Sequence, residues 1–144
     1  MHTIHYSLLT IILLLVGCSR DYGMMPVSGV VLLDGKPAAE VSVTFSPRGA
    51  TGNAAGGFTD AEGRFTVSTG GLPTGSGALA GEYDVLFHKV EISEVSYEES
   101  VKGKQATTTF LVPEKYTRAA TSGIDPVKVE KGGKNNFVFN LTTK

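Results

Sequence analysis

The chain has 144 residues, enough for one ordinary domain, and 41% of them are hydrophobic, which excludes wholesale disorder. Its 13 basic residues nearly balance its 14 acidic residues, so we expect no electrostatic field that would hold nucleic acid or an anionic membrane surface. One cysteine is too few for an internal disulfide or for a zinc site built from several thiolates.

The first features in chain order are a short apolar run and the cysteine. Leu8 to Val16 reads LLTIILLLV, which is far shorter than the ~20 residues that cross a bilayer and is typical of a signal peptide. The sequence Leu15-Val16-Gly17-Cys18 resembles the lipobox of bacterial lipoproteins. This resemblance implies that residues 1–17 are a signal peptide and that Cys18 receives lipid on its thiol and becomes the new N-terminus. The alternatives are an ordinary secretory signal with a chance cysteine and a buried structural cysteine.

The residues around the lipobox also predict a location. No Lys or Arg precedes the apolar run, which departs from the usual positively charged start and leaves the true start codon open. Two or more acyl chains on Cys18 would give durable anchoring. Ser19 follows Cys18 in place of Asp, and the sorting rules of some Gram-negative lipoproteins then favour the outer membrane. We expect residues 18–26 to be a lipidated tether and residues 27–144 to be the domain, facing the periplasm or the exterior.

From Val27 onward the apolar residues recur at every second position, which is the period of a β-strand, and no long helix is indicated. Glycine-containing turns separate the runs, and Asp34-Gly35 and Asp60 to Gly63 supply the residues that hairpin turns prefer. This spacing predicts an antiparallel sandwich or a partly closed barrel. The expected strands are residues 27–33, 41–46, 58–59, 64–68, 83–87, 127–131 and 136–141.

Four segments carry a family resemblance: VSGVVLLDGKP at 27–37, VSVTF at 41–45, TDAEGRFTV at 59–67 and GEYDV at 81–85. In this order they are similar to the carboxypeptidase regulatory-like domain. The resemblance implies an all-β fold, an antiparallel Greek-key β-sandwich of about seven strands, transthyretin-like.

The C-terminal part of the chain extends the resemblance. The segments VPEKY, TSG and NNFVFNL, at 112–116, 121–123 and 135–141, are similar to small planctomycete-type lipoproteins that carry this domain alone. Because the shared residues belong mostly to turns and to the core, the resemblance indicates a fold and says little about activity.

We identify no catalytic residue, metal ligand or cofactor-binding residue. Asp60 and Glu62 look like half of a calcium loop, but no DxDxDG array accompanies them, so we expect Asp60 to accept backbone N–H bonds in a turn. His88 stands at a strand end without a GxSxG motif, and we expect a surface or edge histidine. Glu82 and Asp84 are candidate carboxylates for a hydrolase, and we expect them on opposite faces of their strand.

The most charged stretch is residues 91–108, where four glutamates are followed by Lys102 and Lys104. We expect a solvated insertion or a short charged helix, with a cation or partner site as the alternative. The segments 48–57, 69–81 and 91–108 are the loops expected to carry recognition.

These observations predict a non-enzymatic, lipid-anchored protein of the cell envelope that acts as a binding or structural module. Its expected contacts are the membrane, through lipid on Cys18, and an envelope protein or a wall polymer. Two alternatives remain open: an accessory subunit of an envelope enzyme such as a carboxypeptidase, and an envelope hydrolase that uses a pair of carboxylates.

Overall fold

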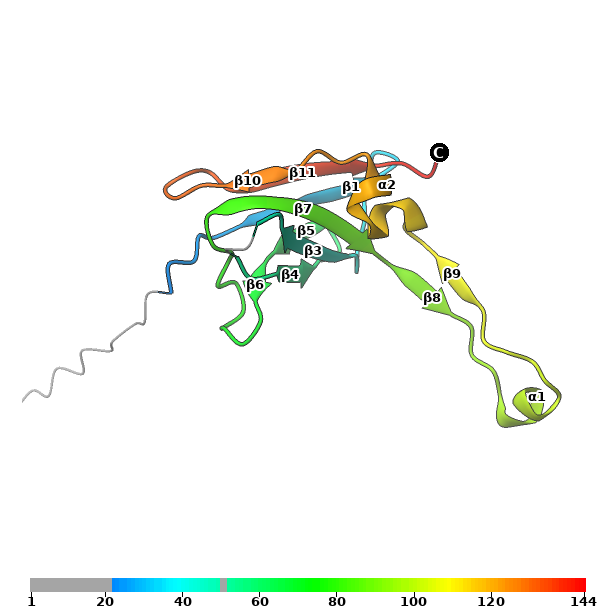
Figure 1. Ribbon diagram of the computed structural model, residues 1–144. Helices are drawn as coiled ribbons and strands as arrows, with labels where there is room; N and C mark the ends of the chain where they lie inside the picture. Colours follow the sequence, from blue (N-terminus) through cyan, green and yellow to red (C-terminus); the bar gives the residue numbers. More distant parts are fainter. Residues whose placement is uncertain (1–21, 50–51) are drawn as a thin grey trace, which may run out of the picture.

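β-Strands dominate the computed structural model, which describes residues 22–49 and 52–144 (Figure 1). Two sheets pack face to face, and a thin arm leaves one end of the pair. This confirms the predicted all-β sandwich. Cys18, the expected signal peptide and the first part of the expected tether lie outside the described residues.

The first sheet is built around β1 (Ser28–Leu33). On one side β1 pairs with β11 (Asn136–Leu141), and it also pairs with β2 (Lys36–Pro37) and β5 (Arg64–Thr66). The pairing of β1 with β11 is parallel, with Ser28 opposite Asn136 and Leu33 opposite Leu141. The sheet is therefore mixed, whereas the sequence predicted antiparallel pairing throughout.

The second sheet is antiparallel and has the order β10-β7-β3-β4-β6. Its long strands are β7 (Gly81–His88) and β3 (Ser42–Pro47), which pair over the whole length of β3. The shorter strands are β10 (Val127–Val129), β4 (Ala55–Phe58) and β6 (Ser68–Thr69). The described residues thus form more and shorter strands than the seven expected.

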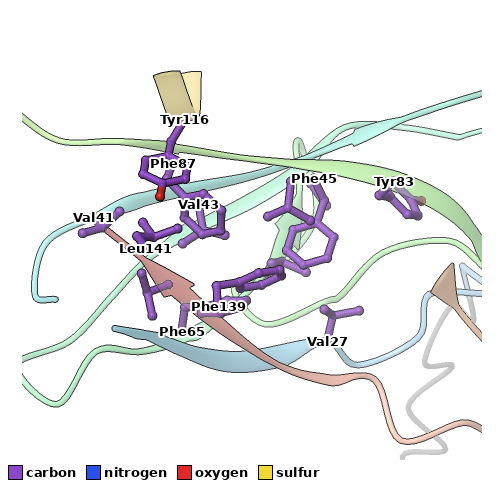
Figure 2. Close-up of a cluster of buried hydrophobic side chains, with 14 of the residues drawn as sticks. Val27, Val41, Val43, Phe45, Phe65, Tyr83, Phe87, Tyr116, Phe139 and Leu141 are labelled. Atoms are coloured by element: carbon purple, nitrogen blue, oxygen red, sulfur yellow. The ribbon is translucent and has the colours of Figure 1, made fainter. Parts of the chain in front are cut away.

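The core lies between the two sheets, and Figure 2 shows its aromatic centre. The rings of Phe87, from one sheet, and Phe139, from the other, meet edge to face with centroids 5.0 Å apart. Edge-to-face contacts of this kind add to the free energy gained by burying the rings. The largest fully buried side chains are Tyr83, Phe45, Phe87, Leu141, Val31, Val41, Val43, Val67, Val112 and Val129.

The predicted turns form, but only one joins neighbouring strands of a sheet. Asp34 and Gly35 have φ angles of 49° and 79°, as a tight hairpin turn requires, and they connect β1 to β2. Asp60 to Gly63 turns the chain from β4, in the second sheet, to β5, in the first. The predicted hairpin at Asp60 is therefore wrong. The turn forms, but β4 and β5 on either side of it do not pair with each other.

Two short helical turns cover one end of the sandwich, where a 3₁₀ turn (Glu114–Thr117) precedes α2 (Ala119–Ser122). Tyr116 is buried there, and its ring meets Phe87 edge to face at 6.4 Å. The chain enters near the other end, where the backbone N–H and C=O of Met25 bond to Ala78 over 2.7 and 3.0 Å. The last residues of the expected tether are thus attached to the sandwich.

Candidate interaction surface

An arm formed by residues 89–111 projects from the end of β7 (Figure 1). Its stem is a ribbon of β8 (Val90–Ile92) and β9 (Thr108–Phe110), with Val90 opposite Phe110 and Ile92 opposite Thr108. Beyond the paired strands, the Ser93 amide donates to the Thr107 carbonyl over 2.9 Å. In the described part of the chain β8 and β9 pair only with each other, so both outer edges of the ribbon are open.

The tip of the arm is the helix α1 (Tyr97–Val101). A capping box sets its start, because the Ser96 side chain accepts from the Glu99 amide and the Glu99 carboxylate accepts from the Ser96 amide. Lys104 lies 2.6 Å from the Glu99 carboxylate and, together with the Ser96 bonds, holds the pKa of that carboxyl below its ordinary value. Local bonds therefore fix the shape of a helix that has no buried residue.

Large apolar side chains are exposed along the whole arm. Tyr97 and Val101 are 83% and 70% exposed, and they share one face of α1 because they are four residues apart. In the stem, Ile92 is 62% exposed and Phe110 is 42% exposed. A concentration of apolar side chains on a projecting element is typical of a binding surface.

A hollow of about 310 Å³ lies at the base of the arm, and we call it the basal hollow. Lys89 lines it, donating to the Ala39 carbonyl over 2.7 Å, with its ammonium 3.6 Å from the Glu40 carboxylate. The wall of the hollow is therefore mostly apolar, and of its two lysines Lys89 has a carboxylate partner while Lys36 is exposed. The residues around it are Leu33, Lys36, Pro37, Ala38, Ala39, Val41, Lys89, Leu111 and Val112.

The arm occupies the stretch that the sequence predicted as a solvated insertion or short charged helix. The predicted helix and the exposure are confirmed. The apolar tip was not predicted, because charged and polar residues dominate the composition of residues 91–108. Two signals were present: Ser96 and Glu99 have the spacing of a capping box, and Tyr97 and Val101 have the spacing of one helix face.

The other two loops expected to carry recognition differ from the arm. In the loop 69–81, Thr69, Gly77 and Ala78 are buried, and Ala78 holds Met25. In the segment 48–57, Ala55 and the two residues after it belong to β4. The two glycines of β4 concealed this strand in the sequence, since they add no apolar side chain to an alternating pattern.

Asp60 makes the turn contacts that the sequence predicted. Its carboxylate accepts the backbone N–H groups of Glu62 and Arg64 over 3.0 and 2.8 Å. In the described residues no group of three or more histidine, cysteine, aspartate or glutamate side chains is placed to hold a metal ion. Within residues 22–49 and 52–144, no helix is long and apolar enough to cross a membrane.

His88 is an exposed residue at the end of β7, as predicted, and its ring meets Phe110 edge to face at 6.2 Å. The prediction for Glu82 and Asp84 was wrong. Residues two apart on a strand share a face, and both side chains lie outside the core, opposite Lys128 and Ser46 in the register. Asp84 pairs with Arg48 over 3.4 Å, and neither carboxylate lines the basal hollow.

Comparison of the chain with protein-family models, with curated proteins and with solved structures found no match.

Proposed function

We propose that this protein is a non-enzymatic, lipid-anchored protein of a bacterial cell envelope that presents a binding arm away from its membrane. The anchor is lipid on Cys18, suggested by the apolar run that ends in Leu15-Val16-Gly17-Cys18. Ser19 after the cysteine favours the outer membrane. The similarity to small lipoproteins with a carboxypeptidase regulatory-like domain agrees with this role.

The observation that carries the binding role is the apolar tip of the arm. An exposed tyrosine and valine on a locally fixed helix have no role in the core of this domain. Placing them on an arm makes them available to another molecule, whereas folding alone would favour burying them or replacing them by polar residues.

The direction of the arm supports the second part of the proposal. The chain joins the sandwich at Met25, beside Ala78 and close to the start of β7 at Gly81. The arm begins after the other end of the same strand, at His88. A strand of this length spans about 24 Å, so the two sites lie at opposite ends of the sandwich (Figure 1). A membrane that holds the N-terminus would therefore face away from the arm.

The anchor is tested by replacing Cys18 with serine in the full chain and feeding the cells labelled palmitate. The original protein should incorporate label, sediment with membranes and band with the outer membrane on a density gradient. Cys18→Ser should carry no label and should be soluble or remain an uncleaved precursor, because serine offers no thiol for the lipid. Ser19→Ala is the matched control and should keep both the label and the membrane association. Identical fractionation of the original chain and Cys18→Ser, without label on either, would rule out the anchor.

A further inference from the structure

The tip of the arm and the basal hollow complement each other in chemistry. The tip exposes Tyr97 and Val101, and the exposed charged residues near them in the chain are Glu94, Glu98 and Lys102. The hollow has apolar walls, with Lys36 exposed at it and Lys89 already paired with Glu40. An apolar side chain beside the Glu98 carboxylate fits an apolar hollow beside the Lys36 ammonium group.

One molecule is unable to make this contact with itself. The helix α1 lies at the end of the arm that is far from the sandwich (Figure 1), whereas the hollow lies at the base, and the paired strands β8 and β9 keep the arm extended. The matching tip must therefore come from another molecule. The tip also disfavours an anionic lipid surface as its occupant, because Glu94, Glu98 and Glu99 outnumber Lys102 and Lys104 and like charges repel.

We infer that the arm binds a second copy of this chain, with Tyr97 and Val101 of each copy seated in the basal hollow of the other. A two-fold axis between the copies makes the contact reciprocal, since each copy offers the same tip and the same hollow. When the axis is perpendicular to the arms, the two arms run antiparallel, which brings the tip of each to the base of the other.

The open edges of the ribbon fit the same arrangement. A two-stranded sheet alone is marginally stable in water, and the open N–H and C=O groups of β8 and β9 are free to pair with further strands. Antiparallel arms can supply that pairing. The inference rests on the proposed function in taking the arm as the binding element, but it is independent of lipid on Cys18.

The first test is photo-cross-linking of the full chain in detergent extracts of the cells, where docked copies need not share one membrane, with a photoreactive phenylalanine derivative in place of Tyr97. We expect a covalent dimer whose cross-linked peptide contains residues 33–41 or 111–112, which line the hollow. The control has the same derivative in place of Val138, which is 60% exposed on β11, far from the arm, and should give no such dimer.

Two other outcomes would overturn the inference in different ways. A cross-link from position 97 to another protein or to a wall polymer would exclude self-docking and would support the proposed function. No cross-link from position 97 at all would contradict both the inference and the use of the arm for binding.

The second test exchanges charges across the contact. Glu98→Lys and Lys36→Glu each change an exposed residue, so the fold should survive, and circular dichroism verifies this. Each change should lower the yield of the cross-linked dimer by roughly fivefold, because it places like charges together. A chain with both changes should recover the yield, since each new lysine then meets a new glutamate on the other copy. A double variant that stays as low as the single variants would contradict the pairing of Glu98 with Lys36.

Discussion

Asp34 links the β1–β2 turn to the C-terminal residues. Its carboxylate accepts the Thr143 hydroxyl over 2.6 Å and the Thr143 amide over 3.1 Å. The bond from the hydroxyl is the main cause that holds the pKa of Asp34 below its ordinary value, because it favours the charged form. A folded pKa below the unfolded one contributes stability above the unfolded pKa, and this contribution is lost as the pH falls through the folded pKa.

Removing the Thr143 hydroxyl should therefore move the pKa of Asp34 back up. In Thr143→Val, an NMR titration of the Asp34 carboxyl should give a higher pKa than in the original protein. The remaining contact between Asp34 and the backbone of residue 143 should therefore weaken at a higher pH. Thr109→Val, on the exposed face of the arm, is the matched control and should leave the pKa of Asp34 unchanged. An unchanged Asp34 pKa in Thr143→Val would show that the hydroxyl is not the cause.

Gly71 and Gly77 lie in the loop 69–81, and alanine variants of the two distinguish the cost of backbone strain from the cost of a steric clash. Gly71 and Gly77 have φ angles of 80° and 88°, so alanine is strained at both positions. A Cβ on Gly71 would meet nothing within 4 Å, whereas one on Gly77 would overlap the Met25 carbonyl. Gly77→Ala should thus be the more destabilising change, near the upper end of the usual range of roughly 0.5–3 kcal/mol.

Thermal unfolding of the two variants measures this difference. Hydrogen exchange should also show that Gly77→Ala exposes the amides of Met25 and Ala78, while Gly71→Ala keeps them protected. Equal melting temperatures and equal protection in both variants would mean that the segment before β1 is not held by this loop.

At the scale of elements, each long strand buries alternate side chains in the core between the sheets and turns the others outward. Val43 is fully buried in β3, and Thr44, the next residue, faces outward opposite Leu86. Val43→Asp places an unpaired carboxylate in the core and should cost several kcal/mol, a large part of the roughly 5–15 kcal/mol by which domains are stable. Thr44→Asp should change the free energy of unfolding by less than about 1 kcal/mol. Urea unfolding followed by circular dichroism measures both, and similar midpoints would contradict the assignment of faces.

The strands with clean alternation were predictable, and the pairings were not. The sequence predicts β1, β3, β7 and β11 within one or two residues, because burial on one face imposes a period of two. Pairing depends on residues far apart in the chain, such as Ser28 and Asn136, and no local pattern encodes it. The sequence therefore did not predict that β1 and β11 pair in parallel, or that the turn at Asp60 leads from one sheet to the other.

The candidate site was predictable in position but not in character. The sequence predicts recognition in three segments, 48–57, 69–81 and 91–108, and the arm occupies the last of them. The apolar tip was missed because two apolar residues among many charges barely change the composition of the segment. Sequence patterns identify apolar residues that are buried in a core. Tyr97 and Val101 are large, apolar and exposed, so such patterns do not identify them.

The arm should also be the first part of the molecule to be cut by a protease. Residues 102–110 are all exposed, and Lys102 and Lys104 lie just beyond α1. Limited trypsin digestion should cut after these lysines before it cuts at Arg64, whose backbone N–H is bonded to Asp60. The two fragments should stay associated, because β7 and β11 lie on opposite sides of the cut and share one core. Earlier cleavage at Arg64 would contradict this order of stability.

At the scale of the whole molecule, the two ends of the sandwich have different proposed roles. The loop 69–81 holds the segment that leads to Cys18, and the arm leaves the opposite end. If Cys18 carries lipid as we propose, the first end would face the membrane and the second would face away from it. Because docked arms run antiparallel, docking would join two copies whose anchored ends point in opposite directions.

The most direct test of this account is energy transfer from a fluorescent label to acceptor lipids, with the lipid-modified full chain on vesicles. The label is attached to Thr74→Cys, exposed in the loop 69–81, or to Lys102→Cys, exposed on the arm, while the thiol of Cys18 is occupied by lipid. The account predicts strong energy transfer from position 74 and weak transfer from position 102. Equal transfer from both positions, stronger transfer from position 102, or a chain that does not bind the vesicles would contradict it.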